Sequence, residues 1–255
     1  MHFIRAHQDR INPDEGKPVN SLVFLDDGAY LASCGGDGYA AAWNVATQEC
    51  LRRVSGTYEQ SRIARISDEQ LFISGRVNIW KWKEERSHLA VGARHVHMAW
   101  FDISTDGTKL VSTDSGLVRC FDLPTCRKSS GWQGIRNGAS YQITGDGKIS
   151  PSMTWLAVST QVPQGSQQRQ TRGRRHHDSS IFVYQFNNAQ LKFRLNSPFS
   201  HRNDALLAWS PDESMLAAAY GPMLRIFDTE SRTEVFSTKL SRSHIKEMAF
   251  TPDGQ

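Results

Sequence analysis

Three residues near the start of the sequence have the types found in a nucleophilic catalytic triad: His7, Ser33 and Asp37. In such a triad a serine hydroxyl attacks, a histidine takes its proton and a carboxylate orients the histidine. Ser33, however, lies in the compact apolar run 31–34 and not in an exposed elbow such as GxSxG. A buried set that also includes the indole of Trp43 can satisfy its hydrogen bonds in series. We therefore interpret His7, Ser33, Asp37 and Trp43 as a structural hydrogen-bonded set, and we assign no catalytic residue.

A basic segment at residues 161–179, QVPQGSQQRQTRGRRHHDS, is the one place where charge gathers. Its arginines are Arg169, Arg172, Arg174 and Arg175. One interpretation is a solvated loop, and the other is an electrostatic contact with an acidic partner or with phosphate. No aromatic residue lies between the arginines, so specific nucleic-acid binding is not expected. The adjacent His176 and His177 lack the further ligands that a metal site needs.

Other signatures of chemistry are absent from the sequence. It contains no phosphate-binding glycine loop and no HExxH motif. The four cysteines, at positions 34, 50, 120 and 126, form no CxxC pair, and we expect buried, reduced thiols. We therefore predict no cofactor and no metal.

Composition places the chain among globular proteins. It has 255 residues, 38% of them hydrophobic and 22% charged, and a net charge of +4. No apolar run approaches the roughly 20 residues of a membrane helix, and the first residues lack the apolar core of a signal peptide. We expect a cytoplasmic protein without a membrane partner.

Two markers show how the chain positions these residues. One is an acidic turn after a short apolar strand, at Asp27-Gly28, Asp68-Glu69, Asp106-Gly107, Asp146-Gly147, Asp212-Glu213 and Asp253-Gly254. The other is an aromatic residue that closes a later strand, at Trp43, Trp80, Phe121, Tyr184 and Phe227. Both recur about every 40 residues, with one surplus of just over 20 residues in the fourth unit. We infer a repeat of four short strands per unit, whose units must stack to bury their apolar faces. In the fifth unit these strands are expected at 205–210, 215–220, 223–228 and 233–239.

The repeat resembles the WD-repeat family of β-propellers. In that family a Gly-His-like pair precedes the first strand, a Ser or Thr lies on the second, an Asp lies in the next turn, and a Trp-Asp-like pair closes the third. The first unit offers Ala6-His7, Ser33, Asp37 and Trp43-Asn44, and the later units keep fewer of these residues. The resemblance implies an all-β propeller of four-stranded antiparallel blades.

The expected domain is a single propeller with five recognisable blades and unpaired terminal strands. The blades are expected at residues 19–56, 61–92, 96–132, 139–196 and 204–240, with a partial blade formed by residues 1–7 and 244–255. A pair of end segments with only a first and a fourth strand leaves the ring incomplete. We therefore expect the chain to be a fragment or a piece of a longer protein.

A non-enzymatic scaffold for protein–protein interaction agrees best with these features, because loops on a rigid ring carry binding surfaces. Trp82, Trp132 and the arginine-rich segment are candidate contacts with a protein partner. The first alternative is contact with a polyanion or nucleic acid through that segment. The second is a propeller hydrolase with a metal near its axis. That hydrolase is disfavoured because the first strands read SLVFL, ALLAW and MAF and lack metal ligands.

Overall fold

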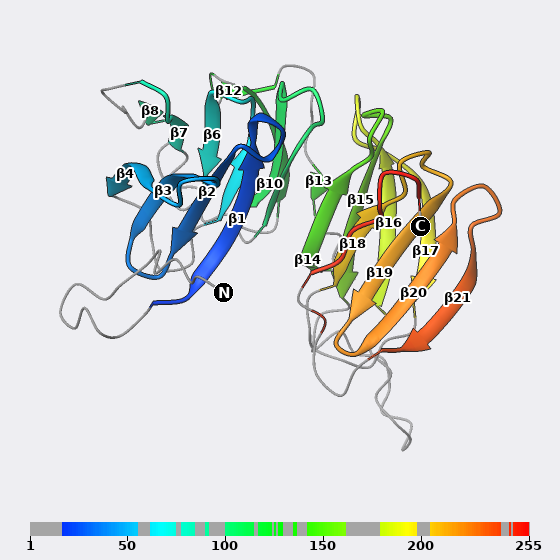
Figure 1. Ribbon diagram of the computed structural model, residues 1–255. Helices are drawn as coiled ribbons and strands as arrows, with labels where there is room; N and C mark the ends of the chain where they lie inside the picture. The colour runs from blue at the N-terminus through cyan, green and yellow to red at the C-terminus, as the bar shows by residue number, and fades with distance from the viewer. Residues whose placement is uncertain are drawn as a thin grey trace. The chain divides into compact units, whose positions relative to one another are not determined.

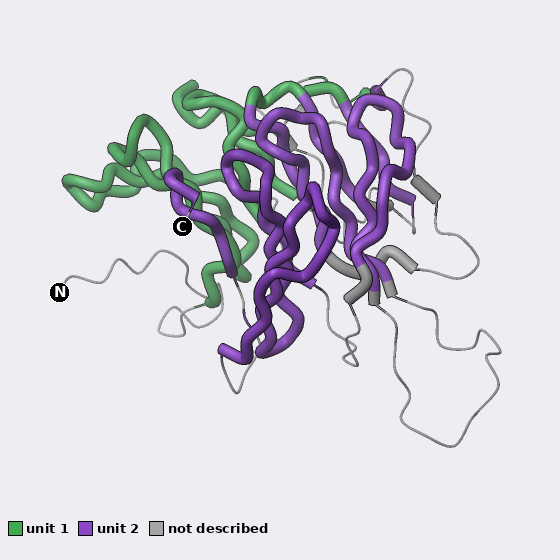
Figure 2. Tube along the Cα trace, turned by 90° about the vertical axis from the view of Figure 1, so that its right-hand side faces the viewer, with its two compact units in different colours: residues 1–98, 106–108, 122–127 green, residues 99–105, 109–121, 128–255 purple. Residues whose placement is uncertain are grey.

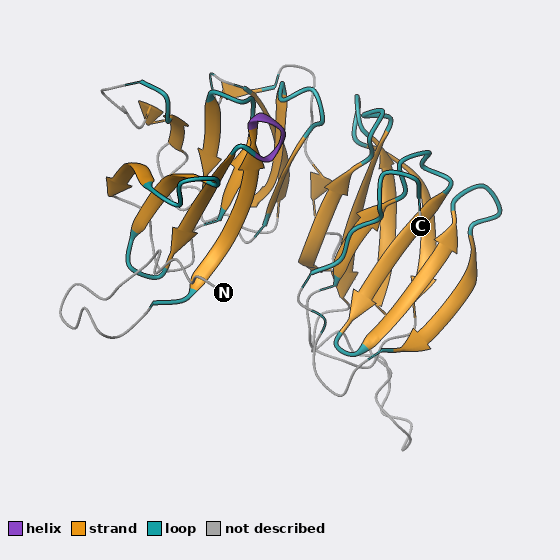
Figure 3. Ribbon diagram, viewed as in Figure 1, coloured by secondary structure: helices purple, strands orange, loops and turns teal. Residues whose placement is uncertain are grey.

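The computed structural model describes residues 17–55, 62–74, 78–84, 90–91, 100–114, 117–123, 125, 127–129, 135–136, 142–161, 179–197, 205–240, 245 and 247–254. These residues form strands in five antiparallel sheets, which we number as blades 1 to 5 in chain order (Figures 1 and 3). Within each sheet, strands that follow one another in the chain lie side by side, except for the last strand of blade 3, which pairs with the third strand of that blade. The prediction of an all-β fold built from four-stranded antiparallel sheets is confirmed.

Each blade is a run of short strands. Blade 1 contains β1 (Val19–Leu25), β2 (Tyr30–Gly35), β3 (Tyr39–Asn44) and β4 (Cys50–Ser55), with the 3-10 turn η1 (Asp26–Gly28) after β1. Blade 2 contains β5 (Ile63–Arg65), β6 (Gln70–Ile73), β7 (Asn78–Lys81) and β8 (Ala90–Val91). Blade 3 contains β9 (Phe101–Ile103), β10 (Lys109–Asp114) and β11 (Leu117–Asp122), with β12 (Arg127–Lys128) and β13 (Ile135–Arg136) both pairing with β11.

The longest strands lie in blade 4, and blade 5 follows it. Blade 4 contains β14 (Gln142–Ile149), β15 (Trp155–Gln161), β16 (Ser179–Gln185) and β17 (Gln190–Ser197). Blade 5 contains β18 (Leu206–Trp209), β19 (Met215–Tyr220), β20 (Met223–Asp228) and β21 (Thr233–Lys239).

The closing aromatic residue marks a repeated backbone irregularity. In blades 1, 4 and 5 the pairing of the third and fourth strands shifts by one residue immediately before it, at Ala42/Trp43, Val183/Tyr184 and Ile226/Phe227. Such a bulge inserts an extra residue into one strand and increases the local twist. These blades therefore share a local geometry as well as a sequence spacing.

One predicted turn is wrong. Asp146 and Gly147 lie inside strand β14, and the turn that follows this strand is at residues 150–154. Gly147 has a different role, because a Cβ atom built on it would lie 2.2 Å from the ring of Trp100. The strand needs a glycine there so that its backbone can approach the indole.

The chain divides into two compact units, which Figure 2 colours separately. Unit 1 comprises residues 1–98, 106–108 and 122–127, and unit 2 comprises residues 99–105, 109–121 and 128–255. Blades 1 and 2 belong to unit 1, whereas blades 4 and 5 and most of blade 3 belong to unit 2. The single propeller domain therefore stays a prediction.

The core of each unit lies between the faces of successive sheets. In unit 1 one cluster joins buried residues of blade 1, including Leu25 and Ala42, to Leu71 and Trp80 of blade 2. In unit 2 a cluster joins blades 3 and 4, and another joins blades 4 and 5. We call the face of blade 1 that points away from its cluster with blade 2 the upstream face of blade 1. Among the described residues, no helix is long and apolar enough to cross a membrane.

Candidate functional site

Ser33 and Trp43, two members of the predicted set, are in contact on the upstream face of blade 1. The indole N–H of Trp43 donates a hydrogen bond of 2.9 Å to the hydroxyl oxygen of Ser33. Leu31 pairs with Trp43 across β2 and β3, and Ser33 follows two residues later on the same face. Ser33 is 1% exposed, so its hydroxyl is not presented to a substrate in the way a nucleophile must be.

Asp37 has two partners that the sequence did not suggest. Its buried carboxylate accepts a hydrogen bond of 3.1 Å from the backbone N–H of Tyr39 and one of 2.7 Å from the guanidinium of Arg53. Arg53 comes from β4, where it pairs with Ala41, and its guanidinium carbon lies 3.8 Å from the centre of the Tyr39 ring. The turn between β2 and β3 is thus fixed by an ion pair and a cation–π contact. His7, the remaining member of the predicted set, lies outside the described residues.

The family pattern does not predict the role of Arg53, because it names no residue on the fourth strand. Strand geometry does predict this contact. An arginine on the fourth strand, opposite the middle of the third strand, lies close enough to reach an acidic side chain in the turn before the third strand.

Blade 2 shows what happens when the set is incomplete. Leu71 pairs with Trp80 as Leu31 pairs with Trp43, but Ile73 occupies the place that corresponds to Ser33. The indole N–H of Trp80 is buried, and within the described part of the chain it has no hydrogen-bond acceptor. Trp80 therefore stabilises blade 2 by packing alone, because Ile73 stands where blade 1 has the serine that accepts the hydrogen bond of the indole.

A second polar cluster lies on the first strands of unit 2 and was not predicted. Lys148 of β14 is 3.1 Å from Asp102 of β9, and the other oxygen of Asp102 accepts a hydrogen bond of 2.8 Å from the N–H of Ile149. The backbone carbonyl of Lys148 accepts a hydrogen bond of 3.0 Å from the indole of Trp209 on β18. These contacts connect the first strands of blades 3, 4 and 5.

Burial and neighbouring charge act in opposite directions on both groups of this ion pair. Burial raises the pKa of Asp102, although Lys148 and the Ile149 N–H act in the opposite direction. Burial lowers the pKa of Lys148, but the carboxylates of Asp102, Asp146 and Glu247 outweigh it and hold the pKa above its usual value. Lys148 therefore stays charged and is unsuited to act as a neutral amine nucleophile. The sequence does not predict this cluster, because the expected turn at Asp146-Gly147 places Lys148 beyond the first strand of blade 4.

The other candidate residues have different outcomes. Trp82 is 3% exposed, and its indole donates a hydrogen bond of 2.8 Å to the carbonyl of Asp68, so it is not an exposed contact. Cys34 and Cys120 are buried as expected, but Cys50 is exposed. Trp132 and Cys126 lie outside the described residues. So do the segment's arginines, Arg169, Arg172, Arg174 and Arg175, with its two histidines.

Metal binding has no support in the part of the chain that the structure describes. No group of three or more His, Cys, Asp or Glu side chains there could hold an ion. The carboxylate of Asp102 is already engaged by a lysine and a backbone N–H.

Comparisons with known proteins identify the class of fold. A chain of a structure described as "Crystal Structure of Mitotic Checkpoint Complex" has a TM-score of 0.72 and 17% identity, over 95% of this chain and 71% of the other. A chain of Kuenenia stuttgartiensis hydrazine synthase has a TM-score of 0.70 and 13% identity, over 92% and 78%. At these identities the similarity concerns the fold alone, and this fold is built from propeller blades.

The first repeat matches a known family model. Residues 3–44 match the family "WD domain, G-beta repeat", which covers the segment that contains Ser33, Asp37 and Trp43. The chain carries a WD repeat within a β-propeller fold, and the predicted resemblance to the WD-repeat family is confirmed. A search of curated proteins found no match to the sequence.

Proposed function

We propose that this chain is a non-enzymatic scaffold that binds other proteins through the exposed surfaces of its blades. WD-repeat propellers generally mediate protein–protein interaction, and one similar fold belongs to a protein complex, whereas another belongs to an enzyme. Fold alone does not decide between these functions.

The observation that carries the proposal is the upstream face of β1. Leu22 and Phe24 are 57% and 60% exposed, although the alternate residues Val23 and Leu25 contribute to the core between blades 1 and 2. Isolated exposed apolar residues are common, but two large ones on the same face of one strand form a patch that is typical of interaction sites. Ser33 and Trp43, on the same face of the neighbouring strands β2 and β3, bond to each other beside this patch.

Affinity capture tests the proposal. The wild-type chain and the double variant Leu22→Ser, Phe24→Ser serve as baits, and captured proteins are quantified and then tested as purified pairs. Leu240→Ser is the matched control, because Leu240 is also 60% exposed but lies in blade 5. We expect at least a tenfold loss of a captured partner with the double variant and no loss with the control. Equal capture by all three baits, or capture of nothing above background, would contradict the proposal.

A further inference from the structure

The fourth strand of blade 4, β17, is the outer edge of its sheet. It pairs with β16 on one side, and within the described part of the chain no strand pairs with its other side (Figure 1). β17 has eight residues and is longer than the outer strands of the other blades. An edge with unpaired backbone N–H and C=O groups is a template to which another strand can add.

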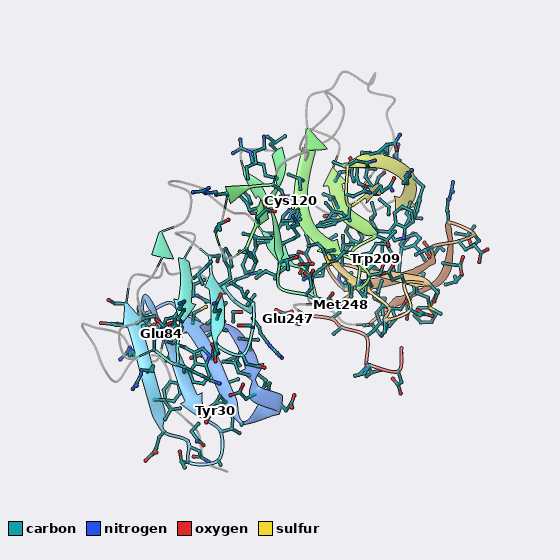
Figure 4. The ribbon with its side chains drawn as sticks, turned by 90° about the horizontal axis from the view of Figure 1, so that it is seen from above. Tyr30, Glu84, Cys120, Trp209, Glu247 and Met248 are labelled. Carbon is teal, nitrogen blue, oxygen red and sulfur yellow. The ribbon has the colours of Figure 1, made fainter. Side chains whose placement is uncertain are left out.

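Both faces of blade 4 are packed. Val158 and Tyr184 belong to the cluster with blade 3. Ile181 and Leu195 belong to the cluster with blade 5, together with Trp209 of β18, which is labelled in Figure 4. The exposure of β17 is therefore a property of its outer edge and not of an uncovered sheet face. A strand that is already ordered also loses less conformational entropy when it binds a ligand.

The strand register shows which backbone groups of β17 face outward. The N–H of Phe186, the residue after β16, donates a hydrogen bond of 2.9 Å to the carbonyl of Thr154. Because backbone groups alternate in direction along a strand, the even-numbered residues of β16 bond to β15 and the odd-numbered residues bond to β17. Residues of β17 opposite the even-numbered ones therefore turn their N–H and C=O groups away from the sheet. These residues are Arg194 and Asn196.

The regular part of this edge is residues 193–197. Pairing between β16 and β17 shifts at Val183/Tyr184, and Lys192 is the residue left without a partner in the register. A bulge and a lysine at an edge both hinder strand addition, so the first part of β17 is protected. Beyond the bulge the pairing is regular to the end of the strand. We call residues 193–197 the docking edge.

Side chains of the docking edge differ between its two faces. Arg194 is exposed, and its Nε donates a hydrogen bond of 2.8 Å to the hydroxyl of Ser180. Phe193 and Leu195 lie on the other face, where half-buried Phe193 packs on the cluster with blade 5 and its ring centre is 6.3 Å from that of Trp155. A strand that pairs with this edge therefore places alternate side chains beside a cation and beside apolar rings.

The outer strands of blade 4 carry positive charge. β15, β16, the turn at residues 186–189 and β17 contain Lys192 and Arg194 but no acidic residue. By comparison, β21 carries Glu234 as well as a lysine, and the guanidinium of Arg53 on β4 is already paired with a carboxylate. Opposite charges across a strand pair are stabilising and like charges are destabilising. The docking edge thus favours a strand with acidic side chains on one face and apolar side chains on the other.

We propose that the docking edge binds an extended segment of another protein in which acidic residues alternate with apolar ones. Hydrogen bonds to the backbone of Arg194 and Asn196 supply the affinity. The cation on one face and the apolar rings on the other select the sequence of the segment. This inference rests on the proposed function in that the ligand is another protein.

Fluorescence anisotropy of a short labelled peptide in which glutamate alternates with valine tests the proposal on the intact chain. Asn196→Pro removes an outward N–H, and Asn196→Thr is the matched control, because it keeps the N–H and suits a strand. Arg194→Gln removes the charge, and Lys239→Gln, at an exposed position of β21, is its control. A second peptide, in which lysine replaces glutamate, keeps the alternation and reverses the charge.

We expect saturable binding of the glutamate peptide to the wild type, a loss of at least about tenfold with Asn196→Pro and with Arg194→Gln, and no loss with either control. The lysine peptide should bind at least about tenfold more weakly. Equal binding of the two peptides, equal binding to all chains, or no saturable binding would overturn the proposal.

Dimerisation of the chain that Asn196→Pro abolishes would also overturn it, because the occupant of the edge would then be a second copy. Partner capture through Leu22 and Phe24 is independent of Asn196. A failure of the docking edge is therefore distinguishable from a failure of the proposed function.

Discussion

Replacing Trp43 and Trp80 by phenylalanine, one at a time, separates the hydrogen bond of the closing aromatic residue from its packing. Both indoles are buried, with 8% and 0% exposure, so each substitution removes a similar amount of packed surface. Only Trp43 has an acceptor, the hydroxyl of Ser33 at 2.9 Å. The indole N–H of Trp80 has none within the described residues.

The expected difference follows from these contacts. Trp43→Phe loses a buried hydrogen bond, whose net contribution to the free energy of unfolding is about 1 kcal/mol. Trp80→Phe removes a buried donor without a partner, and such a group costs at least about 1 kcal/mol in the folded state. We therefore expect Trp43→Phe to be more destabilising than Trp80→Phe by about 2 kcal/mol.

Urea unfolding of the wild type and the two variants, followed by circular dichroism, measures this difference. Ser33→Ala is a useful companion, because in its background Trp43→Phe should cost no more than Trp80→Phe. Equal destabilisation by the two tryptophan variants, or a larger loss for Trp80→Phe, would refute the assignment of the Ser33–Trp43 hydrogen bond as a stabilising contact.

Three further predictions concern buried groups. Gly147→Ala places a Cβ atom 2.2 Å from the ring of Trp100. This substitution should destabilise the fold by about 3 kcal/mol, measured as a lower melting temperature. A substitution with free space around the new Cβ atom should have no such effect. Lys148→Met leaves the carboxylate of Asp102 without its cation and should cost about 2 kcal/mol at pH 7. That cost should shrink toward pH 4, where protonation of Asp102 removes the unpaired charge, and a loss independent of pH would exclude this cause. Burial raises the pKa of the Cys34 thiol from 9.0 to about 12, so above pH 9 the unfolded chain releases a proton that the folded chain keeps. Relative to Cys34→Ala, the wild type should therefore lose about 1.4 kcal/mol of stability per pH unit above pH 9, and parallel stability curves would contradict this.

Sequence reasoning located strands well where apolar alternation and turn residues agreed. In blade 5 the expected strands 215–220, 223–228 and 233–239 are those of the structure. It failed at Asp146-Gly147, because Asp-Gly is a turn signal and local chemistry does not show that the glycine is needed for contact with Trp100, which lies far away in the sequence. Only the three-dimensional arrangement reveals such a reason.

The candidate site was predicted in part for a similar reason. The contact of Ser33 with Trp43 follows from strand register, which alternation and spacing specify. The pairing of Asp37 with Arg53 and that of Asp102 with Lys148 depend on side chains that meet across strands or between sheets. Charge alone does not identify these partners, since the sequence offers 30 basic and 26 acidic side chains. The roles of His7 and of the arginine-rich segment stay predictions.

Hydrogen–deuterium exchange of the chain, alone and saturated with a captured protein, tests the central claim that the blades bind other proteins. The account predicts slower exchange in β1, around Leu22 and Phe24, with no comparable change in β6 at the interior of blade 2. Unchanged exchange in β1, together with protection confined to residues 162–178, would contradict it and would identify the arginine-rich segment as the binding element.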